Sequence, residues 1–290
     1  MKAKKIDPMK SFLKKYPFLQ ESERIYRFVD EAIGTPEPIQ LPERAVRKTM
    51  TEKLPILQQE TYHRRMARAV YLMQEEVFAR IAEAEVPPLM QESAREYLAV
   101  LKKLRKSEKE EFITAVLTQN KAAFAALCEQ HALNEGFIRS TIWRIIAHLT
   151  PPALKEPETW APDADRPAFR ENFCPVCGRR PVVADLRKHR EGRIRHLVCG
   201  GCGTRWIYAR VGCVYCGNTN LEKMHTLEPE HDSSMRLDIC DVCDSYIKTY
   251  RGPVDGSPED AIYRQDWASV HLDLLAEEKG LHKKGNPILE

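Results

Sequence analysis

Apolar residues recur every three or four positions through the first 165 residues of the chain, which is the spacing of one face of an α-helix. No glycine occurs between Gly34 and Gly136, and this favours helices over strands and tight turns. Prolines at 36–42, 87–88 and 151–152 interrupt or end the pattern. The apolar positions are Phe18, Ile25, Phe28 and Val29; Met66, Val70, Met73, Val77 and Ile81; Tyr97, Val100, Leu101 and Leu104; Phe112, Val116, Leu117, Phe124, Leu127 and Cys128; and Ile138, Ile142, Ile145, Ile146 and Leu149.

A helical bundle is the simplest fold that buries these stripes, so we predict an all-α domain over residues 1–165. Residues 157–167 are polar and rich in proline, and we interpret them as a linker to a second domain.

The pattern changes at Phe173, where glycines become frequent and short β-prone runs begin. We predict strands within 181–184, 193–198, 205–210 and 245–250, with a hairpin turn at Glu191 and Gly192. After Pro258 the helical pattern returns. We expect a last helix with one apolar face, formed by Trp267, Val270, Leu274 and Leu275.

Composition describes an ordinary globular protein: 43% of the 290 residues are hydrophobic and 30% are charged. Residues 1–19 are basic but lack a continuous apolar stretch, and no segment approaches the length of a membrane span. We therefore expect a cytoplasmic protein, with no membrane partner. Because cytosolic thiols stay reduced, this weakens a disulfide interpretation of the cysteines and strengthens a metal interpretation.

Eight of the nine cysteines form four Cys-x-x-Cys pairs within one short stretch, enough for two tetrahedral four-sulfur metal sites. Eight thiolates and two divalent ions would change the formal charge of +3 to −1, which does not describe a strongly basic nucleic-acid binder. The candidate metal ligands are Cys174, Cys177, Cys199, Cys202, Cys213, Cys216, Cys240 and Cys243.

The residue after each pair supports metal-binding knuckles, because that position commonly needs a positive φ. The first three pairs are followed by Gly178, Gly203 and Gly217, and the fourth is followed by Asp244. Glycine adopts this conformation freely, and aspartate is one of the few other residues that tolerate it. Pairing in sequence order, with a β-hairpin between two knuckles, is the most economical arrangement. A crossed arrangement, with the first pair joined to the third, stays open.

Four-sulfur sites suit zinc or a single iron ion, and the sequence does not choose between them. Closed sites leave no open position for water, so we expect no metal-dependent hydrolysis. A structural role for both ions is favoured over a redox or metal-transfer role. Four histidines lie between the cysteine pairs, and we expect them at the surface or next to the ligands rather than as ligands: His189, His196, His225 and His231. Cys128 lies upstream on an apolar helical stripe, and we expect it to be a buried core residue.

Charge differs between the two halves of the cysteine region. Residues 178–210 carry a charge of +7, whereas residues 221–245 carry −5. We call residues 178–210 the basic lobe and residues 221–245 the acidic lobe. One interpretation is that the two lobes attract each other or that their charges are simply solvated. The other is that the basic lobe binds an acidic partner. The candidates for partner binding are Arg187, Lys188, Arg190, Arg193 and Arg195.

Six segments carry the four cysteine pairs with their flanks and the C-terminal tail: FCPVCG (173–178), CGGCGTRWIYAR (199–210), CVYCG (213–217), ICDVCDSYIKTY (239–250), DWASVHLDLLAE (266–277) and GNP (285–287). Together these segments resemble the FdhE family of formate dehydrogenase accessory proteins. The resemblance covers residues 173–290 closely and the helical half only in general character, including the opening around Tyr16 and Pro17. Four cysteine pairs with these flanks are specific, whereas any single pair would not be.

The resemblance implies an accessory protein rather than an enzyme. It would act in the cytoplasm on the catalytic subunit of a formate dehydrogenase, before assembly or export, as a chaperone-like maturation factor. The fold implied is α+β and multidomain: a helical domain (1–165), two rubredoxin-like or zinc-ribbon modules (166–211 and 212–256), and a C-terminal helix and tail (257–290). The eight paired cysteines carry over as ligands of two metal ions, iron or zinc. Asp244, and Val214-Tyr215 within the third pair, depart from the common knuckle sequence.

Two other classes of function compete with this one. A zinc ribbon that binds nucleic acid is suggested by the basic lobe, although its aromatic residues are few, chiefly Trp206 and Tyr208, and the acidic lobe would repel phosphates. A small rubredoxin-like electron-transfer protein is suggested by the two four-sulfur sites, if they hold iron.

Overall fold

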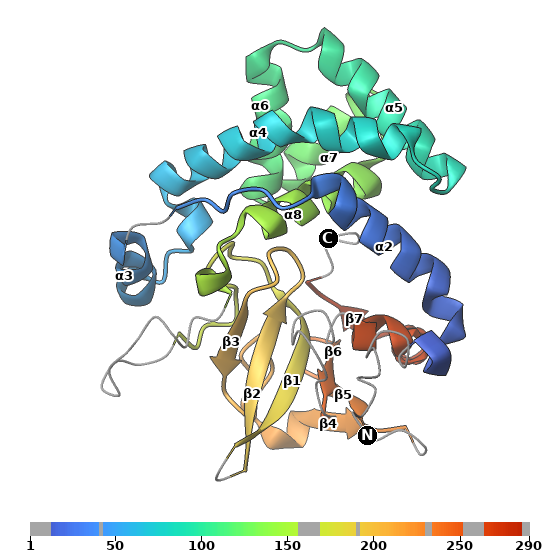
Figure 1. Cartoon of the computed structure of the whole chain (residues 1–290). Helices are drawn as coiled ribbons and strands as arrows, with labels where there is room; N and C mark the ends of the chain where they lie inside the picture. Colours follow the sequence, from blue (N-terminus) through green and yellow to red (C-terminus); the bar gives the residue numbers. More distant parts are fainter. Residues whose placement is uncertain are drawn as a thin grey trace, which may run out of the picture.

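The computed structural model describes residues 13–40, 43–155, 169–189, 192–229, 234–251 and 264–285. Helices occupy the first half and a sheet occupies the second, as the sequence predicts (Figure 1). The expected linker at 157–167 and the turn residue Glu191 lie outside the described residues.

The helical domain is built from seven helices among its described residues, joined by short connections. Its 3₁₀ turns are at Pro17–Leu19, Ile56–Gln58 and Pro152–Leu154. The helices are α2 (Gln20–Ile33), α3 (Glu43–Glu52), α4 (Glu60–Glu83), α5 (Pro88–Lys103), α6 (Lys106–Leu117), α7 (Lys121–Gln130) and α8 (Glu135–Leu149).

Helix α4 lies at the centre of the helical domain and packs against α2, α5, α6 and α8. Its predicted apolar stripe is confirmed: Met66, Val70, Val77 and Ile81 are buried, and Met73 is half-buried. Prolines act at the boundaries as expected, since Pro88 begins α5. Helix α3 was not predicted from the apolar spacing.

The second half forms one continuous sheet rather than two separate ones (Figure 1). Its strand order is β3-β2-β1-β6-β5-β4, with β7 paired to β6. All neighbours are antiparallel except β1 with β6 and β6 with β7. The strands are β1 (Pro181–His189), β2 (Gly192–Cys199), β3 (Arg205–Tyr208), β4 (Met224–Leu227), β5 (Met235–Cys240), β6 (Ser245–Tyr250) and β7 (His282–Lys283).

The two faces of the sheet are covered by different elements. Successive strand residues point to opposite faces. On one face, Leu197 and Ile247 join the hydrophobic core of the helical domain. On the other face, Leu237 and Tyr250 pack with Leu272 of helix α10 (Val270–Glu278). The side chains of the two faces therefore belong to different hydrophobic clusters.

The apolar face expected for the C-terminal helix is wrong. In α10, Val270 is 47% exposed and Leu274 is 58% exposed, whereas Leu272 and Ala276 are buried. Asp273 lies on the sheet side of the helix, 2.6 Å from the buried Nζ of Lys248. This ion pair sets the rotation of the helix, and the apolar spacing alone does not reveal it.

Backbone hydrogen bonds join the helical domain to the sheet region. The N–H groups of Ile56 and Leu57 donate to the carbonyls of Pro175 and Val176 at 3.0 and 2.8 Å. The N–H of Arg205 donates to the carbonyl of Lys155 at 2.9 Å. These bonds fix the orientation of the 3₁₀ turn Ile56–Gln58 on the sheet region.

A second contact lies between α2 and the C-terminal segment, which come together on one side of the molecule (Figure 1). The guanidinium of Arg264 donates two hydrogen bonds to the carboxylate of Glu23, at 3.0 and 3.1 Å. The rings of Tyr26 and Trp267 meet edge to face, with centroids 4.9 Å apart. Within the described ranges, no helix is both long and apolar enough to cross a membrane.

Candidate metal centres

The structure gathers the eight paired cysteines into two groups, in sequence order rather than in the crossed arrangement. The first group is Cys174, Cys177, Cys199 and Cys202, and the second is Cys213, Cys216, Cys240 and Cys243. Within each group all sulfur atoms lie within 4.8 Å of one another. We call these the first and the second cluster.

The sulfur spacing fits a four-coordinate metal ion. In the first cluster, the Sγ atoms of Cys174 and Cys202 lie 3.5 Å apart, and those of Cys177 and Cys199 lie 3.3 Å apart. The corresponding distances in the second cluster are 3.6 and 3.7 Å. Four sulfurs at about 2.3 Å from a zinc ion would be about 3.8 Å apart. The donor set and its spacing therefore suit zinc or a single iron ion.

The residues that follow the four pairs adopt the expected left-handed conformation. Gly178, Gly203 and Gly217 have φ values of 81°, 77° and 75°, and Asp244 has 48°. In the first knuckle of each cluster, this turn lets the N–H of Gly178 or Gly217 donate to the carbonyl of the first cysteine, at 2.8 and 3.1 Å. The sequence expectation is confirmed at all four positions.

Hydroxyl and amide groups around the sulfurs were not identified from the sequence. The Oγ1 of Thr204 lies 3.1 Å from the sulfur of Cys202, and the Oγ of Ser245 lies 2.9 Å from that of Cys243. Both hydroxyl residues come two positions after the last cysteine of their cluster, so a repeated Cys-x-Ser/Thr pattern marks them. The Nδ2 of Asn218 also lies 3.7 Å from the sulfur of Cys240. Such contacts orient metal ligands and stabilise thiolates.

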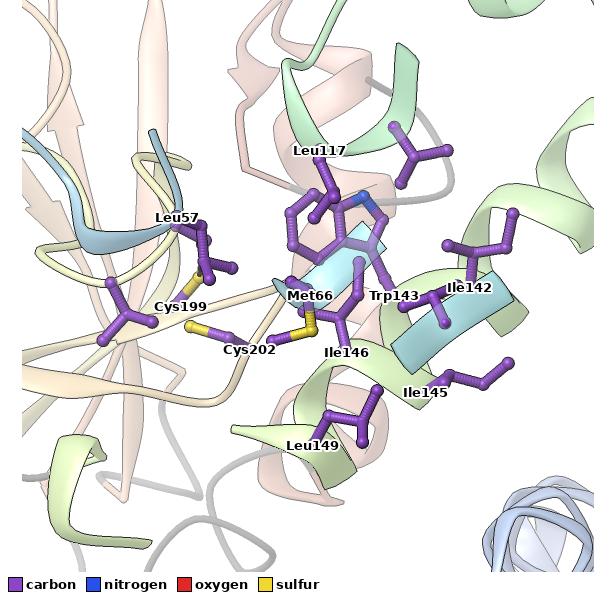
Figure 2. Packing of buried hydrophobic residues seen from close by; sticks show 14 of the residues in the cluster. Leu57, Met66, Leu117, Ile142, Trp143, Ile145, Ile146, Leu149, Cys199 and Cys202 are labelled. Atoms are coloured by element: carbon purple, nitrogen blue, oxygen red, sulfur yellow. Dashed lines mark hydrogen bonds between the residues drawn. The ribbon is translucent and has the colours of Figure 1, made fainter. Parts of the chain in front are cut away.

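The first cluster is sealed inside the protein. All four of its cysteines have 0% exposure, and their atoms belong to the same hydrophobic core as α4 and α8. Figure 2 shows Cys199 and Cys202 beside Leu57, Met66 and Ile146. The Nε2 of Gln119 also donates to the carbonyl of Cys177 at 3.0 Å. The helical domain therefore forms part of the wall of this cluster.

The second cluster lies at the surface. Cys213 and Cys240 are buried, but Cys243 is half-buried and Cys216 is exposed. The N–H groups of Tyr215 and Cys216 point at the sulfur of Cys213, at 3.4 and 3.5 Å. The two clusters thus share a knuckle geometry but differ in their access to solvent.

The surroundings of the thiols favour binding of a cation. Burial raises the pKa of Cys174 and Cys177 well above the ordinary value. Burial has the same tendency at Cys213, but hydrogen bonds from the N–H groups of Cys216 and Tyr215 and from the thiols of Cys216 and Cys243 together outweigh it and lower the pKa of Cys213 to about 7. Thiolates so close together repel one another, and a divalent ion removes that repulsion.

The histidines between the pairs do not belong to either cluster, among those the structure describes. His196 is buried, and its Nδ1 lies 3.3 Å from Asp185. The Nε2 of His225 lies 2.6 Å from Asp241 at the surface. The side chain of His189 and all of His231 lie outside the described residues. Cys128 is buried in α7, as expected for a core residue, and burial raises its pKa to about 12.

The structure corrects one member of the basic lobe. Arg195 is only 3% exposed, so it cannot line a docking surface. Its guanidinium donates to the carbonyl of Gly212 at 2.9 Å and to Asp238 at 3.3 Å. Since Asp238 belongs to the acidic lobe, this contact is the internal attraction between the two lobes. Arg195 therefore joins the two halves of the sheet.

The other basic residues differ in their surroundings. Arg187 pairs with Asp185 at 3.0 Å and stays half-buried. Arg193 donates to the carbonyls of Leu186 and Arg251, at 3.0 and 2.9 Å. Arg190 and the side chain of Lys188 lie outside the described residues.

Comparison with known proteins gives the same picture for this half of the chain. Residues 173–210 match the family model "FdhE, central domain", and residues 211–289 match "FdhE, C-terminal domain". A protein named FdhE homolog from Aquifex aeolicus is 35% identical over 114 residues, which cover 39% of this chain and 40% of that protein. The homolog from Cronobacter sakazakii is 30% identical over 207 residues, or 71% and 62% of the two chains.

The fold is also similar to a solved structure. The crystal structure of the FdhE protein from Pseudomonas aeruginosa matches with a TM-score of 0.61 and 18% identity, over 94% of this chain and 89% of that one. That identity supports the shared fold alone. The matches to the two curated relatives span less than two thirds of each relative's length.

Fold and clusters define a two-part protein, in which a helical domain is joined to a sheet that carries two four-cysteine clusters. The central and C-terminal family models match the sheet region, and the solved structure shares the architecture of almost the whole chain. Residues 173–289 of the chain therefore consist of the central and C-terminal domains of the FdhE family.

Proposed function

We propose that this chain is a cytoplasmic accessory protein, required for an active formate dehydrogenase, that binds the catalytic subunit of that enzyme before assembly or export. The observation that carries the proposal is the pair of four-cysteine clusters, held within segments that match the FdhE central and C-terminal domains. The protein acts as a chaperone-like maturation factor and catalyses no reaction of its own.

The two clusters each hold one metal ion in this proposal, either zinc or iron. Their ligands are the eight paired cysteines, from Cys174 to Cys243. Each cluster supplies four sulfurs, which occupy all four positions of a tetrahedral coordination sphere and leave none for a reacting water. The ions therefore stabilise the knuckles, and activation of water is not part of the function.

Partner binding is assigned to the basic stretch at 187–193, without Arg195. The remaining candidates are Arg187, Lys188, Arg190 and Arg193. A basic patch of this kind attracts an acidic surface on the partner and chiefly changes the association rate. Charge reversal at Arg187 and Arg193 should slow association, and the effect should shrink at high salt.

The nucleic-acid alternative loses support from the side-chain contacts. Arg195 is buried, and its guanidinium is paired with Asp238 inside the protein. Guanidinium groups engaged in this way are less available to phosphates. No binding to DNA or RNA is therefore expected, even at low salt.

Co-purification tests the proposed partner. The tagged full-length chain should recover a formate dehydrogenase catalytic subunit from cells of its own source, and deletion of its gene should abolish formate oxidation. Restoration by the wild-type gene, but not by a variant with Cys174→Ser and Cys213→Ser, would connect the clusters to this role. Unchanged formate oxidation in a deletion strain without a paralogue would refute the proposal.

Metal analysis tests the clusters separately from the partner. Anaerobically purified protein should contain two ions per chain, zinc or iron, because each cluster offers one complete set of four sulfurs. A colourless protein that contains zinc alone would exclude the electron-transfer alternative. A metal content below one ion per chain, after anaerobic purification, would contradict both assignments.

A further inference from the structure

The geometry points to separate roles for the two clusters: the first is a sealed joint between the helical domain and the sheet, and the second exchanges its metal ion with small chelators from solvent. This inference rests on the proposed occupancy of both clusters by metal, but not on the formate dehydrogenase role.

The first cluster and the helical domain hold each other in place. The loop between Cys174 and Cys177 accepts hydrogen bonds from the N–H groups of Ile56 and Leu57, at 3.0 and 2.8 Å. An ion bound by both cysteines would fix the two ends of that loop. An ion in the first cluster therefore holds the two carbonyls that bind the 3₁₀ turn of the helical domain.

Side-chain packing closes the remaining sides of the first cluster. The position of Gly201, between Cys199 and Cys202, lies against the ring of Trp143, since a Cβ there would come within 2.9 Å of Cε3. The guanidinium of Arg179 lies over the same ring, 5.0 Å from its centroid. No solvent reaches the four cysteines, which all have 0% exposure. A chelator can reach this ion only after the two domains separate locally.

The second cluster has no comparable cover among the residues that the structure describes. Cys216 is exposed, and three apolar side chains near the knuckles also face solvent: Val211 is 53%, Leu221 is 63% and Val242 is 56% exposed. None of the backbone hydrogen bonds of its knuckles comes from the helical domain within the described ranges. An incoming ligand can therefore approach the ion beside the sulfur of Cys216 without any domain movement.

The exchange is an ordinary ligand substitution. If an ion is held by the second cluster, a donor atom of the chelator would replace the sulfur of Cys216, and the released thiolate would take a proton from water. The other three sulfurs are displaced in turn, and the ion leaves as the chelate. No electron is transferred in these steps. The two clusters should release their ions at different rates, because only the first cluster must be exposed by local separation of the domains before a chelator can reach it.

The test uses the zinc-loaded full chain and the chromogenic chelator 4-(2-pyridylazo)resorcinol in excess. We expect one ion per chain to be released in a fast phase and the other at a rate lower by about tenfold or more, which corresponds to about 1.4 kcal/mol of additional barrier. Iodoacetamide added after the fast phase should label Cys213, Cys216, Cys240 and Cys243, and peptide mass spectrometry should find the other paired cysteines unmodified.

Variants assign the phases. Cys216→Ser should lower the zinc content by one ion and remove the fast phase, while Cys128→Ser, a buried cysteine outside both clusters, should change neither. Hydrogen exchange on the wild-type chain after the fast phase should still show protection of the amides of Ile56 and Leu57. That measurement does not depend on whether any variant folds.

Three outcomes would overturn the inference. They are release of both ions in one phase, labelling of the first cluster before the second, and loss of protection at Ile56 and Leu57 during the fast phase. None of these results bears on recovery of a formate dehydrogenase subunit, so failure here and failure of the proposed function are distinguishable.

Discussion

The Nζ of Lys248 on β6 lies 2.6 Å from Oδ2 of Asp273 on α10, although Lys248 has no exposed surface. The same ammonium lies 2.7 Å from Oδ1 of Asp266, and Lys283 completes the group at 2.8 Å from that carboxylate. A buried cation in hydrocarbon surroundings is costly unless it is paired in this way. The C-terminal helix is therefore held to the sheet by charge as well as by apolar contact.

We predict that Lys248→Met destabilises the protein by about 3–5 kcal/mol, because it leaves buried carboxylates with one cation fewer. Urea unfolding at neutral pH, followed by far-ultraviolet circular dichroism, measures the change. Lys279→Met is the matched control, since Lys279 is exposed near the end of α10. A difference between the two variants below about 1 kcal/mol would contradict the assigned role of the ion pairs.

Gly285→Ala should be far more damaging than Gly280→Ala. Both glycines have positive φ values, 86° and 72°, so both variants incur left-handed strain of about 1–2 kcal/mol. Only at Gly285 would the new Cβ collide with backbone, namely with the carbonyl group of Pro181. We expect a total cost of roughly 2–5 kcal/mol for Gly285→Ala. Thermal unfolding of both variants checks this, and equal losses would show that the tail does not pack as described.

Gly285 also bears on the second cluster. The hydroxyl of Tyr215, inside the third cysteine pair, donates to the carbonyls of Pro181 and Lys284 at 3.2 and 3.1 Å. Displacement of the tail by Gly285→Ala should therefore disturb this knuckle and speed zinc release from the second cluster. Gly280→Ala should leave the release rate unchanged.

Gly201→Ala tests the packing between the first cluster and α8. Its Cβ would lie 2.7 Å from Cδ of Arg179 and 2.9 Å from Cε3 of Trp143, a ring that is almost completely buried. Overpacking of this kind costs about 1–3 kcal/mol. Gly203→Ala, in the same knuckle, meets no atom within 4 Å but has a φ of 77°. We expect only Gly201→Ala to increase hydrogen exchange at Ile56 and Leu57, and a similar increase in Gly203→Ala would refute this account.

Asp30 should contribute stability that disappears in acid. Burial opposes ionisation of this carboxyl, but hydrogen bonds from His148 and Arg144 outweigh it, so its pKa lies below the ordinary 3.8. A folded-state pKa that is depressed stabilises the folded protein fully above the unfolded value, and this stabilisation is lost as pH falls through the folded value.

The measurement compares the wild-type chain with Asp30→Asn at several pH values. The difference in unfolding free energy should stay constant from neutral pH to about pH 5 and should shrink below about pH 4. Because both proteins contain the same clusters, acid-driven metal loss affects each of them and largely cancels in the difference. A difference that grows toward low pH would contradict the direction of the pKa shift.

The sequence predicted those features that depend only on residues close together in the chain. The stripe from Met66 to Ile81 predicted α4, and the residues after the cysteine pairs predicted the positive φ at Gly178 and Asp244. Helix α3 was missed because its fully buried positions include Ala45 and Thr49, which make no apolar stripe. Strand β5 was missed although Met235, Leu237 and Ile239 alternate with polar residues, since the segment is short and lies in an acidic stretch.

Long-range contacts determined what the sequence could not reveal. Asp273 turns toward Lys248 and thereby exposes Leu274, against the expectation from apolar spacing. Arg195 is buried because Asp238, on a strand beyond β1 and β6, accepts its hydrogen bond. The parallel pairing of β1 with β6 likewise has no signal within either strand, and it converts two cysteine-bearing hairpin units into one sheet.

The ion pair between Glu23 and Arg264 joins residues 241 positions apart in the sequence. A ribosome must therefore add almost the entire chain before the buried carboxylate of Glu23 meets its partner. Synthesis proceeds at about 5–20 residues per second, so the helical domain waits on the order of ten seconds or more with α2 incompletely covered. During that interval the exposed side of α2 is open to chaperones, and a nascent chain truncated before Arg264 would retain that exposure.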